Sequence, residues 1–167
     1  MRWDPKTAKI TPPHVTLAGT YDRTGIPSPA SEAETITRLG GLHQLVASFD
    51  LIISGIRTFP PADQPVIYLG IEPTPEVLAA RQALLGFLGP DKHRRFHPHL
   101  TLAMRLQGEA LRKALAYYQN GDWATRRMVF TVNELRMMQR GPGDASWRCV
   151  ANFPLNGNGR PSPCPQT

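Results

Sequence analysis

The chain has 167 residues, enough for one domain with a buried core, and its 41% hydrophobic and 19% charged residues are typical of a globular protein. Its two cysteines, Cys149 and Cys164, are too few for a disulfide scaffold and lack the spacing of a metal site. The start of the chain resembles no signal segment, and the longest apolar run is too short to span a bilayer. These features exclude a disulfide-rich secreted domain and a membrane protein, and they predict a cytoplasmic protein.

The formal net charge is +6, and the excess is confined to one part of the chain. Residues 91–148 hold eleven Lys or Arg against five Asp or Glu, whereas the remainder holds eight of each sign. Such a basic region fits a polyanionic partner, RNA or a nucleotide. Charge alone fits a solvated basic surface equally well.

The first predicted element is a short strand. Residues 1–11 are polar and irregular, and Pro12 and Pro13 then hold the backbone extended, so the pattern predicts a strand over 14–20. Residues 21–30 contain Gly and Pro at turn positions and are predicted to form a loop. Because this loop leaves the strand directly, it is a candidate for contacting substrate.

Capping patterns predict the helices. Ser31 with Glu34 forms a capping box that opens a helix to about Ala47, in which Gly40-Gly41 marks a bend or close packing. Thr74-Pro75-Glu76 begins a second helix, which Gly89-Pro90 ends. A third amphipathic helix is expected over 108–119. The remaining strands, rich in β-branched and aromatic residues, are expected at 49–58, 66–72, 99–105, 127–132, 135–138 and 147–155.

The order of these elements repeats: strand, helix, strand, strand, a linking helix, and again strand, helix, strand, strand. Such a repeat indicates duplication. The fold class expected is therefore α+β, a bilobal duplicated fold whose two mainly antiparallel sheets flank a central cleft with helices outside. Residues 1–155 form one domain in this interpretation, and 156–167 form a flexible tail. The strand and helix that precede the second half have no counterpart before the first, so one sheet edge is expected to be uncovered.

Two copies of one motif stand at matched places in this repeat. Pro12-Pro13-His14-Val15-Thr16-Leu17 and Pro98-His99-Leu100-Thr101-Leu102 both read Pro-His-apolar-Thr-Leu, with the histidines 85 positions apart. In a strand, alternate side chains share a face, so each copy presents His and Thr together and buries the apolar residues on the other side. The doubled motif predicts that two His/Thr pairs come together at one site.

Two imidazoles facing one another across the expected cleft, one on each wall, can act as base and acid in the same turnover, because His titrates near neutrality. This suits in-line displacement at phosphorus, in which the nucleophile loses a proton on one side and the leaving oxygen gains one on the other. Thr16 and Thr101 can donate hydrogen bonds to the non-bridging oxygens. No metal is required, since the leaving group is protonated, and a strained 2′,3′-cyclic phosphate is a suitable substrate.

The paired His-x-Thr-Leu motifs resemble the two-histidine phosphoesterase superfamily, in the branch of 2′-5′ RNA ligase and RNA 2′,3′-cyclic phosphodiesterase. The segments 96–103 and 147–155 resemble the second motif and the closing strand of that family. The resemblance implies a bilobal fold, metal-independent hydrolysis of cyclic phosphodiesters or the reverse ligation, and catalytic roles for His14, Thr16, His99 and Thr101. It favours His99 as the group that activates water. It also implies a strand and helix before the first motif, which this sequence lacks.

Other residues extend the candidate site. Tyr21 and Phe96 could stack on a base, or could pack in the core or at the rim. Arg105 follows the second motif two positions after Ala103, so it is a candidate phosphate contact, although a regular strand would turn it to the opposite face. The expected partners are RNA or cyclic-phosphate nucleotides, with no cofactor and no membrane. The chain is expected to be a monomer, or a dimer through the uncovered sheet edge.

Two alternatives stay open from the sequence. His93, His97 and His99 would suit a metal site, but Pro98 separates two of them and no carboxylate or Cys joins them at a familiar spacing. The other alternative is a non-catalytic RNA-binding protein with a degenerate or truncated phosphoesterase fold, against which the retention of both complete motifs argues.

Overall fold

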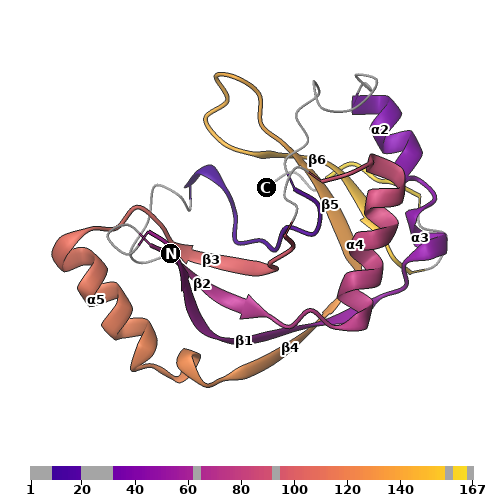
Figure 1. Cartoon of the computed structure of the whole chain (residues 1–167). Helices are drawn as coiled ribbons and strands as arrows, with labels where there is room; N and C mark the ends of the chain where they lie inside the picture. The colour runs from indigo at the N-terminus through magenta and orange to yellow at the C-terminus, as the bar shows by residue number, and fades with distance from the viewer. Residues whose placement is uncertain (1–8, 20–31, 62–64, 92–94, 157–159, 165–167) are drawn as a thin grey trace. The chain divides into compact units, whose positions relative to one another are not determined.

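The computed structural model describes residues 9–19, 32–61, 65–91, 95–156 and 160–164 (Figure 1). The chain divides into two compact units, which are described separately below. The first unit comprises residues 1–16, 52–72 and 97–130, and the second comprises residues 17–51, 73–96 and 131–167. Both units mix helices with antiparallel strands, so the α+β class expected from the sequence is confirmed.

Sheet A has four strands in the order β3-β2-β1-β4, and both β1/β2 and β2/β3 pair antiparallel. Its strands lie close to their predicted ranges: β1 Phe49–Phe59, β2 Val66–Ile71, β3 His99–Ala103 and β4 Arg127–Val132. β3 is shorter than expected. It ends before Arg105, whose φ of 58° is left-handed and incompatible with a continuing strand.

One face of the first unit's sheet is its hydrophobic side. Ile67 of β2 and Ala103 of β3 are cross-strand partners and are fully buried. The helix α5, Gly108–Gln119, packs on them and is followed by the short 3₁₀ helix Asp122–Ala124. The helix residues in this cluster are Leu111, Ala114 and Tyr118. With α5 on this face, the alternate side chains of β2 and β3 point to the opposite face.

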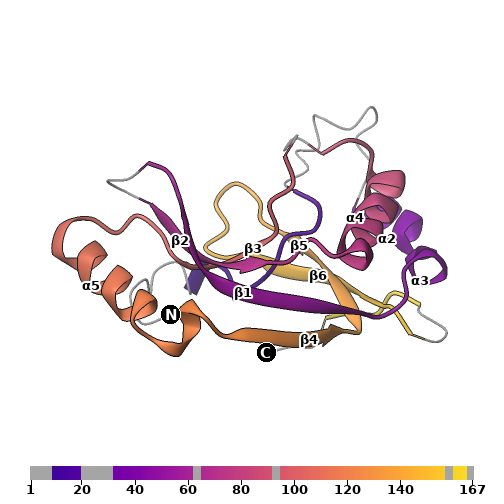
Figure 2. The ribbon, with the colours of Figure 1, turned by 60° about the horizontal axis from the view of Figure 1, so that its bottom comes forward.

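The second unit joins sheet B, made of β5 (Glu134–Gln139) and β6 (Arg148–Pro154), to three helices. These helices, α2 (Glu32–Leu39), α3 (Leu42–Leu45) and α4 (Pro75–Leu88), lie together in Figures 1 and 2. Their apolar faces share one core with the inward side of β6. That core is centred on Leu39, Leu42, Val77, Ala80, Leu84, Ala151 and Phe153.

The helix boundaries follow the capping residues. The Thr74 hydroxyl accepts a hydrogen bond from Val77 N at 3.3 Å, and Gly89 ends α4 with a φ of 84°, which glycine adopts readily. The continuous helix expected to run to about Ala47 is wrong, because the chain turns at Gly40-Gly41 and forms α2 and α3 separately. The expected capping residue Ser31 lies outside the described residues.

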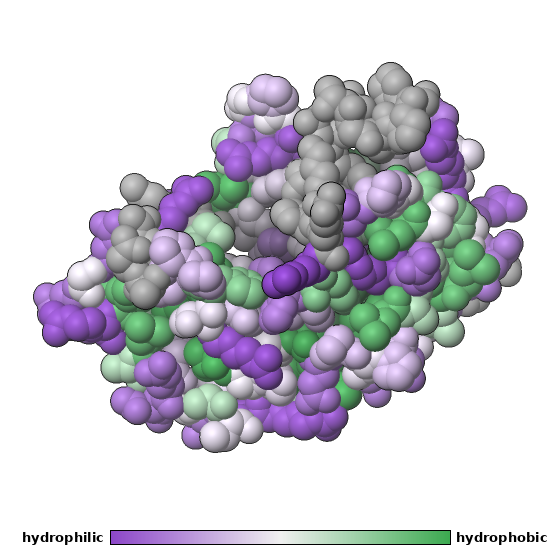
Figure 3. All heavy atoms as spheres, in the orientation of Figure 1, coloured by the Kyte–Doolittle hydropathy of each residue, from purple (hydrophilic) through white to green (hydrophobic). Residues whose placement is uncertain are grey.

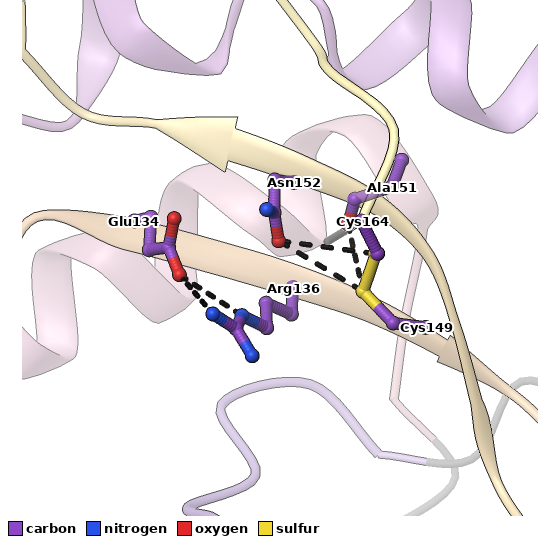
Figure 4. Close-up of a disulfide and its surroundings, with 6 residues drawn as sticks. All are labelled: Glu134, Arg136, Cys149, Ala151, Asn152 and Cys164. Carbon is purple, nitrogen blue, oxygen red and sulfur yellow. Dashed lines mark hydrogen bonds and ion pairs between the residues drawn. A yellow bond between two sulfur atoms is a disulfide. The ribbon is translucent and has the colours of Figure 1, made fainter. Parts of the chain in front are cut away.

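A disulfide ties the C-terminal segment to β6 (Figure 4). Cys149 and Cys164 are 15 positions apart in sequence, and their Cα atoms are 5.8 Å apart. Ser162 pairs with Asn152 of β6 in an antiparallel bridge beside the bond, and the Asn152 amide oxygen lies 3.8 Å and 3.9 Å from the two sulfur atoms. The segment expected to be a loose tail is therefore attached at Ser162 and Cys164. The cysteine count did not predict this pairing, which depends on the position of β6.

The described surface is mixed in character. Figure 3 shows hydrophilic side chains over much of one face, with smaller apolar groups between them. Among the residues that the structure describes, no helix combines the length and the apolar composition needed to cross a bilayer.

Candidate active site

The two sequence motifs are paired directly within the first unit. Val15 forms an isolated antiparallel bridge with Leu100 of β3. In this register His14 lies opposite Thr101, and Thr16 lies opposite His99, so each histidine faces the hydroxyl of the other motif. Cross-strand neighbours of this kind have Cβ atoms about 5 Å apart and share one face of the sheet. The sequence predicted the shared face within each motif, but the expectation that the motifs form opposite walls of a cleft is wrong, because Val15 and Leu100 pair directly within one unit.

Both histidines are held in the same way. His14 Nδ1 lies 2.9 Å from the carbonyl oxygen of Pro12, and His99 Nδ1 lies 2.7 Å from the carbonyl oxygen of His97. A carbonyl oxygen can only accept, so Nδ1 of each ring must carry the proton. In the neutral ring Nε2 is then the basic nitrogen, and it is free of this contact. The matched hydrogen bonds give the two imidazoles one tautomer and a fixed orientation.

The proline before each histidine lies between these hydrogen-bonded groups. It has no N–H of its own and restrains the preceding residue to extended backbone, so the carbonyl two positions before the histidine stays within reach of Nδ1. In the second motif the register is held further, since the Ile71 N–H donates to the Pro98 carbonyl oxygen at 3.2 Å. The repeated Pro-His pair thus has a structural basis that the sequence pattern alone did not supply.

Two aromatic residues that the sequence did not single out support the second motif. The rings of Phe59 and Tyr68 stack with centroids 4.0 Å apart. The imidazole of His99 meets both rings edge-on, at 5.0 Å and 5.4 Å between centroids, and His97 also contacts both. Tyr68 is the cross-strand partner of Thr101 and is 3% exposed. This packing limits rotation of His99 about its side-chain bonds.

A buried ion pair in the second unit fixes segments that adjoin both motifs in sequence. Arg81 of α4 and Asp91 form a salt bridge of 2.8 Å. The Asp91 carboxylate accepts a hydrogen bond from Gly19 N, and Arg81 donates to the carbonyl oxygen of Leu17. The same guanidinium lies 4.3 Å from the centre of the Phe96 ring. Leu17 follows Thr16 directly and Phe96 precedes His97, so this network anchors the chain beside each motif.

The three substrate-contact candidates have different positions. Phe96 is half-buried beneath Arg81 and packs against the core of the second unit. Arg105 is exposed, in the turn after β3. Tyr21 lies outside the described residues, as does His93 of the metal alternative. Among the described residues, no group of three or more His, Cys, Asp or Glu side chains is arranged to hold a metal ion.

Comparison with known proteins identifies the family. The protein-family model described as "2'-5' RNA ligase superfamily" matches residues 1–144, which is most of the chain. The chain therefore belongs to the 2'-5' RNA ligase superfamily, and the family expected from the sequence is confirmed.

Two curated relatives are similar to this chain in sequence. A protein of Bacillus cytotoxicus is 33% identical over 107 residues, which cover 63% of this chain and 58% of the relative. A protein of Bacillus pumilus is 30% identical over 109 residues, which cover 65% of this chain and 60% of the relative. Both have the name "Putative phosphoesterase". The chain thus matches about three fifths of the length of each relative.

Proposed function

We propose that the chain is a cyclic phosphodiesterase that opens 2′,3′-cyclic phosphates of RNA ends or nucleotides by acid-base catalysis between His14 and His99. The observation that carries the proposal is the antiparallel pairing of the motifs, with one tautomer imposed on both rings. Membership in the superfamily and the names of the two relatives support phosphoester chemistry. The basic character of residues 91–148 supports an anionic substrate.

In the proposed reaction, one neutral imidazole accepts a proton from water at Nε2 while the water oxygen attacks phosphorus. The bond from phosphorus to one ribose oxygen breaks, and the other imidazole, protonated, gives its Nε2 proton to that oxygen. A ribose monophosphate results, and the two rings have exchanged protonation states. We assign the water-activating role to His99. The same steps with a ribose hydroxyl in place of water as the nucleophile form a phosphodiester and describe ligation.

The threonines stabilise charge in this scheme. As the oxygen attacks, the phosphoryl group gains negative charge on its non-bridging oxygens, and hydroxyl donors already in position stabilise it without reorganising. Thr16 lies opposite His99 and Thr101 lies opposite His14, so each hydroxyl stands beside the imidazole of the other motif. Protonation of the leaving oxygen replaces coordination by a metal, and the proposal is therefore metal-independent catalysis.

The experiment is hydrolysis of 2′,3′-cyclic AMP by the purified chain, with and without EDTA. His14→Ala and His99→Ala are each expected to abolish turnover, whereas the wild type stays active in EDTA. His43→Ala is the matched control, because His43 in α3 also holds its Nδ1 against a carbonyl, that of Gly40 at 3.0 Å, but belongs to the second unit. Full activity of either motif variant would refute the mechanism. Loss of wild-type activity in EDTA would favour a metal enzyme, and binding of RNA without hydrolysis would favour the RNA-binding alternative.

A further inference from the structure

Sheet A carries a third kind of polar side chain on the face of the two motifs. The register pairs Arg57 of β1 with Tyr68 of β2, and Tyr68 with Thr101 of β3. Partners across antiparallel strands point to the same side, so Arg57 shares the face of Thr101 and His99. No sequence motif marks Arg57, and its position becomes apparent only when three strands are paired.

The Arg57 side chain does not remain above its cross-strand partner Tyr68. It bends along the sheet to Gly70, where a Cβ atom would lie 3.2 Å from Arg57 Nε and 3.5 Å from its Cδ. Gly70 is the cross-strand partner of His99. The base of the guanidinium therefore lies against the cross-strand neighbour of His99, on the same face of the sheet.

The absence of a side chain at Gly70 is what permits this arrangement. A β-bulge between Ser54 and Ile56, with Gly55 at a φ of 65°, brings the Ser54 carbonyl oxygen to within 2.8 Å of the place of a Gly70 Cβ. Any larger residue would collide with that oxygen and displace Arg57. A glycine within an otherwise apolar strand commonly marks such a close approach. Here the missing side chain leaves space for Arg57 next to His99.

The charge of Arg57 is not committed elsewhere. Within the described part of the chain, no side-chain hydrogen bond or ion pair engages the Arg57 guanidinium, and this side chain is exposed. By contrast, Arg127, another arginine of the first unit, forms an ion pair with Glu72, with 3.0 Å between Arg127 Nε and the Glu72 carboxylate. An unpaired guanidinium beside two imidazoles and two hydroxyls is suited to an anion, because its planar fork can donate two parallel hydrogen bonds to one phosphate.

We infer that Arg57 binds the non-bridging oxygens of the phosphate that reacts, and so fills the role that the sequence suggested for Arg105. The inference rests on the proposed function and names a further residue that contacts the substrate. In the reaction the phosphodiester, with one negative charge, gains a second as the base removes the proton of water. The fixed positive charge of Arg57 is then worth more in the transition state than in the bound substrate.

The test compares Arg57→Ala and Arg57→Lys with Arg112→Ala. Arg112 is an exposed arginine of α5, the helix that packs on the opposite face of the sheet, so it controls for loss of charge alone. With 2′,3′-cyclic AMP, which contains a single phosphate, we expect Arg57→Ala to lower kcat/KM by about 100-fold, which is typical of removing one oxyanion donor. Arg57→Lys should recover part of this loss, and Arg112→Ala should stay within about twofold of the wild type. Added guanidinium ion should partly rescue Arg57→Ala only.

A second readout does not need turnover. Titration calorimetry with adenosine 2′-monophosphate and with inorganic phosphate should show affinity at least tenfold weaker for Arg57→Ala, with Arg112→Ala unchanged. If the wild type fails to hydrolyse the cyclic nucleotide, the proposed function fails, while the affinity difference still decides the role of Arg57. Equal affinity and activity in wild type and Arg57→Ala would overturn the inference. So would a loss confined to oligonucleotide substrates, since Arg57 would then contact a neighbouring phosphate.

Discussion

Removing the carboxylate of Asp91 should destabilise the protein far more than removing an exposed acidic residue. The side chains of Arg81 and Asp91 are only 11% and 5% exposed. Asp91→Ala would leave the Arg81 guanidinium buried without this counter-ion and remove the acceptor of the Gly19 N–H. Breaking one partner of a buried pair costs about 3–5 kcal/mol. That is a large share of a total stability of about 5–15 kcal/mol.

The assay is equilibrium unfolding in urea, followed by circular dichroism. With a slope of about 1–3 kcal/mol per molar urea, the midpoint should fall by at least about 1 M. The double variant Arg81→Met/Asp91→Ala removes both charges, so we expect it to be more stable than Asp91→Ala alone, although the orphaned Gly19 N–H should keep it below wild type. Because the pair anchors residues next to both motifs, Asp91→Ala should also lower kcat/KM under conditions where it is folded.

The matched control is the exposed i,i+4 pair of Glu109 and Lys113, whose side chains are 67% and 63% exposed. Glu109→Ala should change the free energy of unfolding by no more than about 0.5 kcal/mol. The reasoning would be refuted by a cost below about 1 kcal/mol for Asp91→Ala. It would equally be refuted if the costs of Asp91→Ala and of Arg81→Met, each measured alone, simply added in the double variant, because uncoupled residues behave in that way.

Two further predictions concern other parts of the structure. Replacing Cys149 and Cys164 by Ser should lower the free energy of unfolding by up to about 3 kcal/mol for a loop of this length, measured as a lower urea midpoint. Two reactive thiols in the native, unreduced protein would contradict the disulfide. Burial, and secondarily the neighbouring Tyr117, raises the pKa of the Tyr118 hydroxyl, so the folded state keeps this proton to higher pH than the unfolded chain. The resulting stability is complete below about pH 10 and lost as pH rises through the folded pKa, so alkaline unfolding curves of Tyr118→Phe should decline less steeply than those of wild type.

Local patterns were sufficient for most of the secondary structure. The hydroxyl of Thr74 and the proline after it begin α4, and Gly89 with its positive φ ends it. These signals lie within one helical turn of the two ends, so the limits of α4 were predictable from sequence. The paired glycines at Gly40-Gly41 were recognised as a weak point, but the sequence did not decide between a bend and a break. That choice depends on how α3 packs against its neighbours, which is a long-range property.

The site was only partly predictable for the same reason. Arg57, Tyr68 and Gly70 belong to no motif, and the one local signal was a glycine inside an apolar strand. Their association with the second motif requires the β1/β2 and β2/β3 registers together with the bulge at Gly55. Likewise, nothing in a 15-residue spacing indicates that Cys149 and Cys164 approach each other, because Cys164 reaches β6 through the bridge at Ser162.

The sequence by itself determined which residues share a face, because the alternation of a strand is a local property. It therefore placed His14 with Thr16, and His99 with Thr101, and the doubled motif predicted one family. Only the tertiary structure decided that Val15 pairs with Leu100, which puts each histidine opposite the other motif's threonine. It also decided that an arginine two strands away reaches the same face. Pairing between distant strands depends on register, and register is set by the packing of the whole sheet.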